Sequence, residues 1–167
     1  MANFQKSPKT SSTRRNRLLR EREYDPYKLR LKLPEPALCS ECGVVFHKGR
    51  WQWMAPPAGA NEMLCPACHR TQDKCPAGYL TLSGLFLKEH LEEILNLARN
   101  VEARQKALHP LERIMAIEEE EQNGLLITTT EASLARTLGD AIHHAYQGEL
   151  EYQYTDGANL LEVNWKR

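Results

Sequence analysis

The sequence predicts an α+β protein with a basic arm (residues 1–34), a loop-rich segment with cysteines (residues 35–82) and an α+β domain (residues 83–167). Three observations carry this prediction. Ten of the 22 lysines and arginines lie in the first 34 residues. Two C-x-x-C pairs stand among prolines and glycines in the middle segment. From Ser83 onward, apolar residues repeat first at helical spacing and later at alternate positions, which indicates a mixture of helices and half-buried strands.

The arm carries much of the positive charge of the chain. Residues 1–34 hold ten basic against three acidic side chains, a net +7, while residues 80–167 hold eight against fifteen, a net −7. We expect the arm to be largely disordered, because it has few apolar residues to bury. Clustered positive charge favours nucleic acid, since binding releases counterions from the phosphates. The alternative is a solvated tail that folds back on the acidic body. The predicted contact residues of the arm are Arg14, Arg15, Arg17, Arg20 and Arg22.

Composition bears on the class of protein and its location. Charged residues make up 26% and hydrophobic residues 41% of the chain, as in soluble globular proteins. No apolar run approaches the roughly 20 residues that span a bilayer. The N-terminus also lacks the apolar core of a secretory signal. We therefore expect a cytoplasmic protein without a membrane partner, which is monomeric in isolation because its acidic body shows no exposed apolar stripe.

The α+β domain is predicted to open with a helix and a hairpin. The helix begins at Ser83 as a plausible N-cap and ends near Leu108, because Pro110 restricts the residue before it. The dipeptide Asn123-Gly124 is a strong hairpin signal between two extended runs, 112–121 and 125–130. The buried face of this hairpin is predicted to contain Ile114, Ala116, Leu125 and Ile127.

A second helix and two further strands complete the predicted domain. Thr130 is the expected N-cap of the helix and Gly148 follows its end. The core stripe of this helix is predicted to be Leu134, Leu138, Ile142 and Ala145. The strands show alternation, first in Leu150, Tyr152 and Tyr154, then in Leu161, Val163 and Trp165. The order α-β-β-α-β-β predicts an antiparallel sheet with both helices on one face.

The cysteine spacing predicts a metal site. Cys39 and Cys42 form one C-x-x-C pair, Cys65 and Cys68 form the other, and 22 residues separate the pairs. Each such turn presents two thiolates to one ion, and two turns complete the tetrahedral shell that Zn²⁺ prefers in structural sites. Gly43 directly after the first pair lets backbone amides approach the sulfurs. The pattern is typical of a zinc ribbon, in which the metal has no open position for water.

Other interpretations of the same residues stay open. The C-x-x-C pairs also suit a redox dithiol or an iron–sulfur cluster. His47 or His69 could replace one of the cysteines, because each lies next to a pair. Cys75, which stands apart from both pairs, could serve as an alternative ligand.

A second group of candidate contacts lies between the cysteine pairs. Lys48, Arg50, Trp51 and Trp53 combine cations with aromatic rings, which suits phosphates and stacked bases. The alternative is that the tryptophans shield the metal core. The sequence shows no glycine-rich phosphate loop and no evident acid–base pair, so we expect a protein that is not an enzyme.

Several motifs resemble a known group of proteins. The cysteine pairs are followed by Gly78, Ser83-Gly84-x-Phe86-Leu87-x-x-His90, His109-Pro110-Leu111-x-Arg113-Ile114 and Thr128-Thr129-Thr130-x-x-x-Leu134-Ala135-Arg136. On these residues, the stretch 39–167 resembles small bacterial zinc-ribbon proteins. More distantly, it is similar to the N-terminal region of the NMD3 family of ribosomal large-subunit export adaptors. The resemblance implies a partner, which is the ribosome or ribosomal RNA.

These patterns predict a zinc-containing RNA- or ribosome-binding accessory factor of translation or ribosome biogenesis. Its acidic α+β domain would offer a further surface to a protein partner. A DNA-binding transcriptional regulator would use the same arm and ribbon. A zinc-stabilised adaptor for protein–protein interactions would use neither the arm nor the ribbon to bind nucleic acid. Both alternatives stay open at this point.

Overall fold

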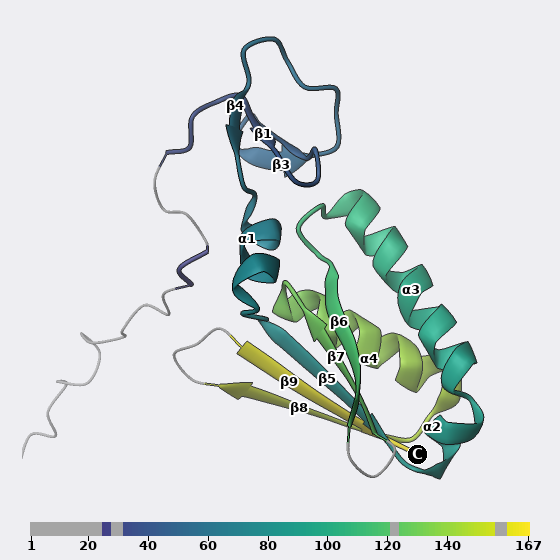
Figure 1. The fold of residues 1–167 in the computed structure, drawn as a ribbon. Helices are drawn as coiled ribbons and strands as arrows, with labels where there is room; N and C mark the ends of the chain where they lie inside the picture. The colour runs from purple at the N-terminus through teal and green to yellow at the C-terminus, as the bar shows by residue number, and fades with distance from the viewer. Residues whose placement is uncertain (1–24, 28–31, 121–123, 156–159) are drawn as a thin grey trace, which may run out of the picture.

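The computed structural model of this chain describes residues 25–27, 32–120, 124–155 and 160–167. Within these residues the protein is α+β, with two mixed sheets and four helices (Figure 1). The first sheet and one helix belong to residues 32–76, termed here the cysteine unit. The second sheet and the other helices belong to residues 77–167, termed here the α+β unit. The five arginines predicted as contacts in the arm lie outside the described residues.

The cysteine unit is built from very short elements. They are β1 (Ala37–Cys39), β2 (Val45–His47), β3 (Arg50–Gln52), β4 (Asn61–Met63) and α1 (Pro66–Asp73). The strand order is β3-β2-β1-β4, with β1 parallel to β4 and the other neighbours antiparallel. Strands β2 and β3 fall within the segment that was expected to be loop-rich. Neither β1, β4 nor α1 was predicted, because strands of three residues are too short to show alternation.

The α+β unit has a five-stranded sheet with the order β6-β7-β5-β9-β8. Its strands are β5 (Gly78–Ser83), β6 (Ile114–Glu120), β7 (Gly124–Thr129), β8 (Glu149–Thr155) and β9 (Leu160–Lys166). The central strand β5 is antiparallel to β7 but parallel to β9. The predicted all-antiparallel sheet is therefore wrong, since the prediction lacked β5, of which all but the last residue falls within the segment 35–82. The two hairpins, β6–β7 and β8–β9, are confirmed.

The helices of the α+β unit are α2 (Leu85–Glu89), α3 (Leu91–Leu108) and α4 (Ala132–Tyr146). Helix α4 packs on the middle of the sheet and α3 packs beside α4, so the core lies between the helices and one sheet face (Figure 1). The strand side chains that point into this core include Leu80, Leu82, Ile127, Val163 and Trp165, all at most 1% exposed. No helix in the described part of the chain is both long and apolar enough to cross a membrane.

The helix predicted from Ser83 to Leu108 is two helices. Ser83 ends β5, and Gly84 is the N-cap of α2, with a φ of 106° that disfavours any residue with a side chain. The chain leaves helical geometry again at His90, where φ is −117° and ψ is 19°. The end at Leu108 before Pro110 is confirmed. Similarly, Thr130 is not the N-cap of α4, because Glu131 occupies that position and the Thr130 hydroxyl donates to Leu111 instead.

Two predicted core positions are also wrong. In β6, the register shifts between Ile114 and Ala116, so Ile117 rather than Ala116 pairs with Ile127 and packs on the core. A bulge of this kind moves the following side chains to the other face of a sheet. In α4, Ala145 is exposed, and the core stripe is completed by buried Ala135 and Gly139. Leu134, Leu138 and Ile142 are buried as predicted.

Gly139 allows α4 to lie close to the sheet. A Cβ atom at this position would be 2.7 Å from Val163 Cγ1 and 3.3 Å from Leu150 Cδ1. We predict that Gly139→Val lowers the free energy of unfolding by about 1–3 kcal/mol, because overpacking forces the helix from the sheet. Urea unfolding followed by circular dichroism measures this loss. His144→Val, at an exposed position of the same helix, is the matched control. Equal stability of the two variants would contradict this account of the helix–sheet contact.

Candidate metal centre

Four cysteines from two distant parts of the cysteine unit meet at one point. Cys39 ends β1 and Cys42 lies in the turn that follows, whereas Cys65 and Cys68 lie at the start of α1. Their four Sγ atoms all lie within 4.8 Å of one another. All four are free cysteines rather than disulfide partners. The structure thus confirms that these residues are placed to hold a metal ion together.

The local sequence explains how each pair turns. After Cys39, the amide of Gly43 donates to the Cys39 carbonyl at 2.9 Å, and Gly43 itself adopts a φ of 76°. At the second pair, Pro66 occupies the first turn of α1, where its missing N–H costs nothing. Cys65 is the N-cap of this helix, and its sulfur accepts from the amide of Cys68 at 3.4 Å. The helix N-terminus therefore points partial positive charge at the cluster.

The cluster is largely shielded from solvent. Cys39, Cys65 and Cys68 are at most 9% exposed, and Cys42 is half-buried. The apolar residues packed around the sulfurs are Val44, Trp51, Leu64, Ala67 and Leu111. Burial of this kind keeps water from the sulfurs. It also raises the free energy of each thiolate unless a cation compensates its charge.

The surroundings of the cysteines shift the pKa values of their thiols in opposite directions. Burial raises the pKa of Cys68 to about 11 and raises that of Cys65 further still. Burial opposes ionisation of Cys39 as well, but backbone N–H groups aimed at its sulfur outweigh this and lower its pKa to about 7. The amide of Cys65, for example, donates to Cys39 Sγ at 3.3 Å. Without metal, Cys65 and Cys68 are therefore protonated at neutral pH, so metal binding must release protons and weakens as the pH falls.

One cation from the α+β unit reaches the cluster. The guanidinium of Arg113 donates to Cys42 Sγ at 3.0 Å and to Cys68 Sγ at 3.3 Å. Burial of Arg113 disfavours its charge, but the hydrogen bond to Cys42 and the nearby sulfurs outweigh this and raise its pKa. Sequence reasoning missed this role. The only signal was the place of Arg113 in the sequence His109-Pro110-Leu111-x-Arg113-Ile114, which gives no reason for a contact with sulfur.

The alternative ligands do not join the cluster. The group of ligand atoms within reach of one ion contains neither His47 nor His69. The His69 ring instead lies 3.5 Å from Asp73. Cys75 is exposed and lies outside the group. The cluster is therefore formed by the four predicted cysteines.

The four predicted contact residues near β3 have different surroundings. Lys48 and Arg50 are exposed at the turn between β2 and β3. Trp51 packs against the cysteine cluster and against Phe46, as a shielding residue would. Trp53 is 41% exposed, and its Nε1 donates to the Lys106 carbonyl at 2.7 Å, so it joins the two units.

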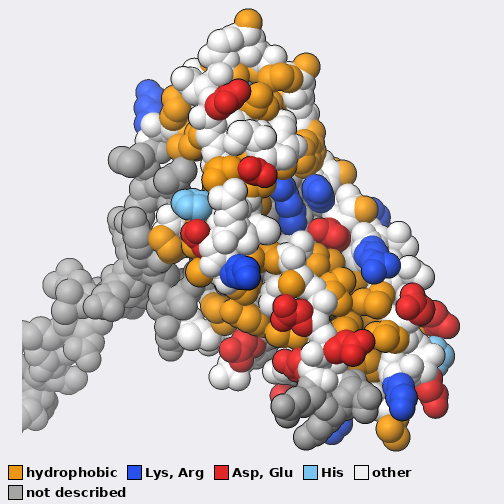
Figure 2. Space-filling model, viewed as in Figure 1, with side chains coloured by type: hydrophobic (Ala, Val, Ile, Leu, Met, Phe, Trp, Pro, Cys, Tyr) orange, Lys and Arg blue, Asp and Glu red, His pale blue; other side chains and the backbone are white. Residues whose placement is uncertain are grey.

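A groove runs between the two units beside the cluster. Arg50 and Trp51 line it from the cysteine unit, and the segment from Leu108 to Glu112 lines it from the α+β unit. Figure 2 shows basic side chains at the level where the units meet, with acidic side chains both above them, on the cysteine unit, and below them, over the sheet and α3. Two of the predicted contact residues thus lie at a concave surface.

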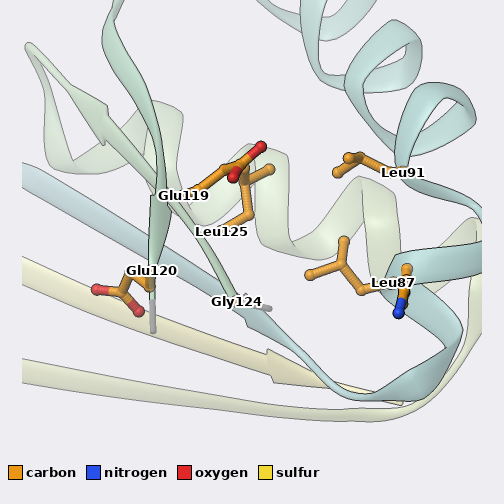
Figure 3. Close-up of a pocket in the computed structure, with 7 residues that line it drawn as sticks. Leu87, Leu91, Glu119, Glu120, Gly124 and Leu125 are labelled. Carbon is orange, nitrogen blue, oxygen red and sulfur yellow. The ribbon is translucent and has the colours of Figure 1, made fainter. Parts of the chain in front are cut away.

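A second hollow lies at the other end of the sheet. Leu87, Leu91 and Leu125 give it an apolar surface, and Figure 3 shows Glu119 on the same side of β6 as these leucines, with Glu120 pointing away. This hollow is remote from the cysteines, because Leu125 pairs with Leu82 near the end of β5, whereas the cysteine unit joins its beginning. It contains none of the predicted site residues.

Comparison of the chain with protein-family models, curated proteins and solved structures found no match.

The geometry leads to a direct test of the metal ligands. We predict that Cys65→Ser lowers the bound metal from one ion per chain to nearly none, because it removes a buried ligand from a shell of four. Cys75→Ser is the matched control and should keep its metal, since Cys75 is exposed outside the cluster. Atomic emission spectrometry of the purified proteins measures the metal content. Equal metal content in the two variants would show that the cluster is not the metal site.

Proposed function

We propose that this protein is a non-enzymatic RNA- or ribosome-binding accessory factor of translation or ribosome biogenesis, stabilised by a zinc ion. The observation that carries the metal part is the meeting of four cysteine sulfurs within 4.8 Å. Four thiolates from two C-x-x-C turns suit the tetrahedral preference of Zn²⁺. Cys39, Cys42, Cys65 and Cys68 would hold the ion. Because they fill its shell, the ion would supply folding energy rather than a site for substrate.

The RNA part is supported by the distribution of charge. The first 34 residues carry a net +7 and the last 88 a net −7. The basic arm therefore provides positive charge for phosphates on a body that would itself be repelled by them. Lys48 and Arg50 add two exposed cations, and Arg50 lies with Trp51 along the groove between the units. Basic and aromatic side chains along one groove suit a single-stranded segment of RNA.

Ribosomal RNA is proposed as the target over duplex DNA on the resemblance to ribosome-associated zinc-ribbon proteins. Sedimentation of tagged protein with cell lysate through a sucrose gradient, followed by sequencing of bound RNA, tests this choice. Co-migration with a ribosomal subunit and enrichment of ribosomal RNA are the expected results. Protein that stays at the top of the gradient without RNA would overturn the proposal and favour a protein-interaction module. Preferential competition by duplex DNA would favour a regulator of transcription.

A charge-reversal pair tests the surface near β3. We predict that Lys48→Glu combined with Arg50→Glu weakens binding to ribosomal RNA and lowers its dependence on salt. The negative slope of log K against log salt should become shallower by about 0.7 for each lost phosphate contact. Binding measured by fluorescence anisotropy at several salt concentrations gives this slope.

The matched control has the same change in net charge at another surface. Lys88→Glu combined with Arg99→Glu alters exposed residues of α2 and α3. This control should bind RNA nearly as well as the unaltered protein. If both pairs weaken binding equally, the effect is one of net charge and the assignment of the β3 surface is wrong. If removal of residues 1–24 leaves binding unchanged, the assignment of the arm is wrong.

A further inference from the structure

We propose that Arg113 is a positioning residue of the metal centre, through which the bound metal holds the cysteine unit against the α+β unit. This inference rests on the proposed metal role of the four cysteines. It goes beyond that role because it makes the relative placement of the two units depend on the metal. The proposal concerns a side chain that lies outside the cysteine unit and is not itself a ligand.

The contacts of Arg113 reach most of the cluster. One terminal nitrogen donates to Cys68 Sγ at 3.3 Å. The other donates to Cys42 Sγ at 3.0 Å and lies 3.9 Å from Cys65 Sγ. A single guanidinium thus contacts sulfurs from both C-x-x-C pairs. Its planar set of donors allows this, whereas the single ammonium of a lysine does not.

The other end of Arg113 is held by the α+β unit. Its Nε donates to the Pro110 carbonyl at 2.9 Å, and its backbone amide donates to Thr130 Oγ1 at 2.9 Å. Thr130 is only 1% exposed, and its hydroxyl in turn donates to the Leu111 carbonyl. The guanidinium is therefore aimed at the sulfurs by the segment that enters β6 and the segment that leaves β7, which lie together at the open end of this hairpin. Side chains that orient or neutralise metal ligands in this way tune how tightly the metal is held.

The charge of the cluster explains why this contact depends on metal. Four thiolates around a divalent ion carry a net charge of −2, which one guanidinium partly compensates. Hydrogen bonds from a cation to a thiolate are stronger than those to a neutral thiol. A metal-loaded cluster with this charge therefore strengthens the contacts that Arg113 makes with sulfurs of both C-x-x-C pairs. By linkage, docking of Arg113 must strengthen metal binding by the same factor.

Further contacts between described residues of the two units involve the same short segment. Trp53 donates to the carbonyl of Lys106, and its ring lies 5.9 Å from the Arg113 guanidinium carbon. Leu111 packs on the cysteine cluster. The segment 106–113 is therefore the part of the α+β unit that responds to the cluster. Loss of metal would loosen it and alter the groove that Arg50 and Trp51 line.

Three variants of the full chain test this inference. In the zinc-loaded protein, Arg113→Gln should lose metal to a chromophoric chelator about 10–100-fold faster than the unaltered chain, which is the range for lost outer partners of metal ligands. Arg113→Lys, which keeps the charge but not the planar donors, should fall between the two. Arg104→Gln, at an exposed position of α3, is the matched control and should behave like the unaltered chain.

Two further readouts separate a role at the metal from a loss of fold. In the cobalt-substituted protein, the thiolate-to-metal absorption bands should shift in Arg113→Gln but not in Arg104→Gln. In hydrogen exchange of the unaltered chain, metal removal should speed exchange at residues 106–113, whereas β5 and β9 should stay protected. Slow exchange in those strands in Arg113→Gln shows that the α+β unit remains folded.

The failures of the two proposals are distinguishable. If the unaltered chain binds no metal, the metal role itself is wrong. If it binds metal, yet Arg113→Gln loses metal no faster and shows unshifted cobalt bands, only the inference about Arg113 is overturned. Unchanged exchange at residues 106–113 after metal removal would overturn the dependence of docking on metal.

Discussion

The arrangement of the cysteine unit depends on compensation of charge at four sulfur atoms. These sulfurs lie within 4.8 Å of one another and are mostly buried. As thiolates they would repel each other strongly in such a site, and as thiols they would attract each other only weakly. A divalent cation bound by all four sulfurs would compensate the charge of the thiolates and so remove their mutual repulsion. The unit has strands of three residues and a small apolar cluster, so it has little else to hold its loops together.

The α+β unit has the opposite character. Its core joins the five-stranded sheet to α3 and α4 through many fully buried side chains, and none of them belongs to the cysteine cluster. The α+β unit is therefore held together by its own core. From it, Arg113 donates to a cysteine sulfur and Leu111 packs against the cysteine cluster. We therefore expect the α+β unit to be stable through its own core, and the cysteine unit to depend on a metal ion for its fold. The groove involves both units, because Arg50 and Trp51 of β3 line one side of it and the segment before β6 lines the other.

The ligand set and the hairpins could be predicted from the sequence because their signals are local. Two C-x-x-C pairs and the Asn123-Gly124 turn each carry their information within a few residues. The central strand β5 was missed although Leu80 and Leu82 alternate with less buried residues, because no neighbouring turn pairs it with another strand and its partners, β7 and β9, lie far along the chain. Arg113 was missed for the same reason, since only the fold brings it to Cys42. The bulge between Ile114 and Ala116 shows that one inserted residue changes which later residues of a strand face the core.

The central claim is that the four cysteines together hold one zinc ion and nothing else completes its shell. X-ray absorption at the zinc edge of the purified protein tests it most directly. The account predicts one zinc ion per chain with four sulfur neighbours at about 2.3 Å. A shell with nitrogen or oxygen neighbours in place of a sulfur, or a protein that contains iron or no metal at the cluster, would contradict it.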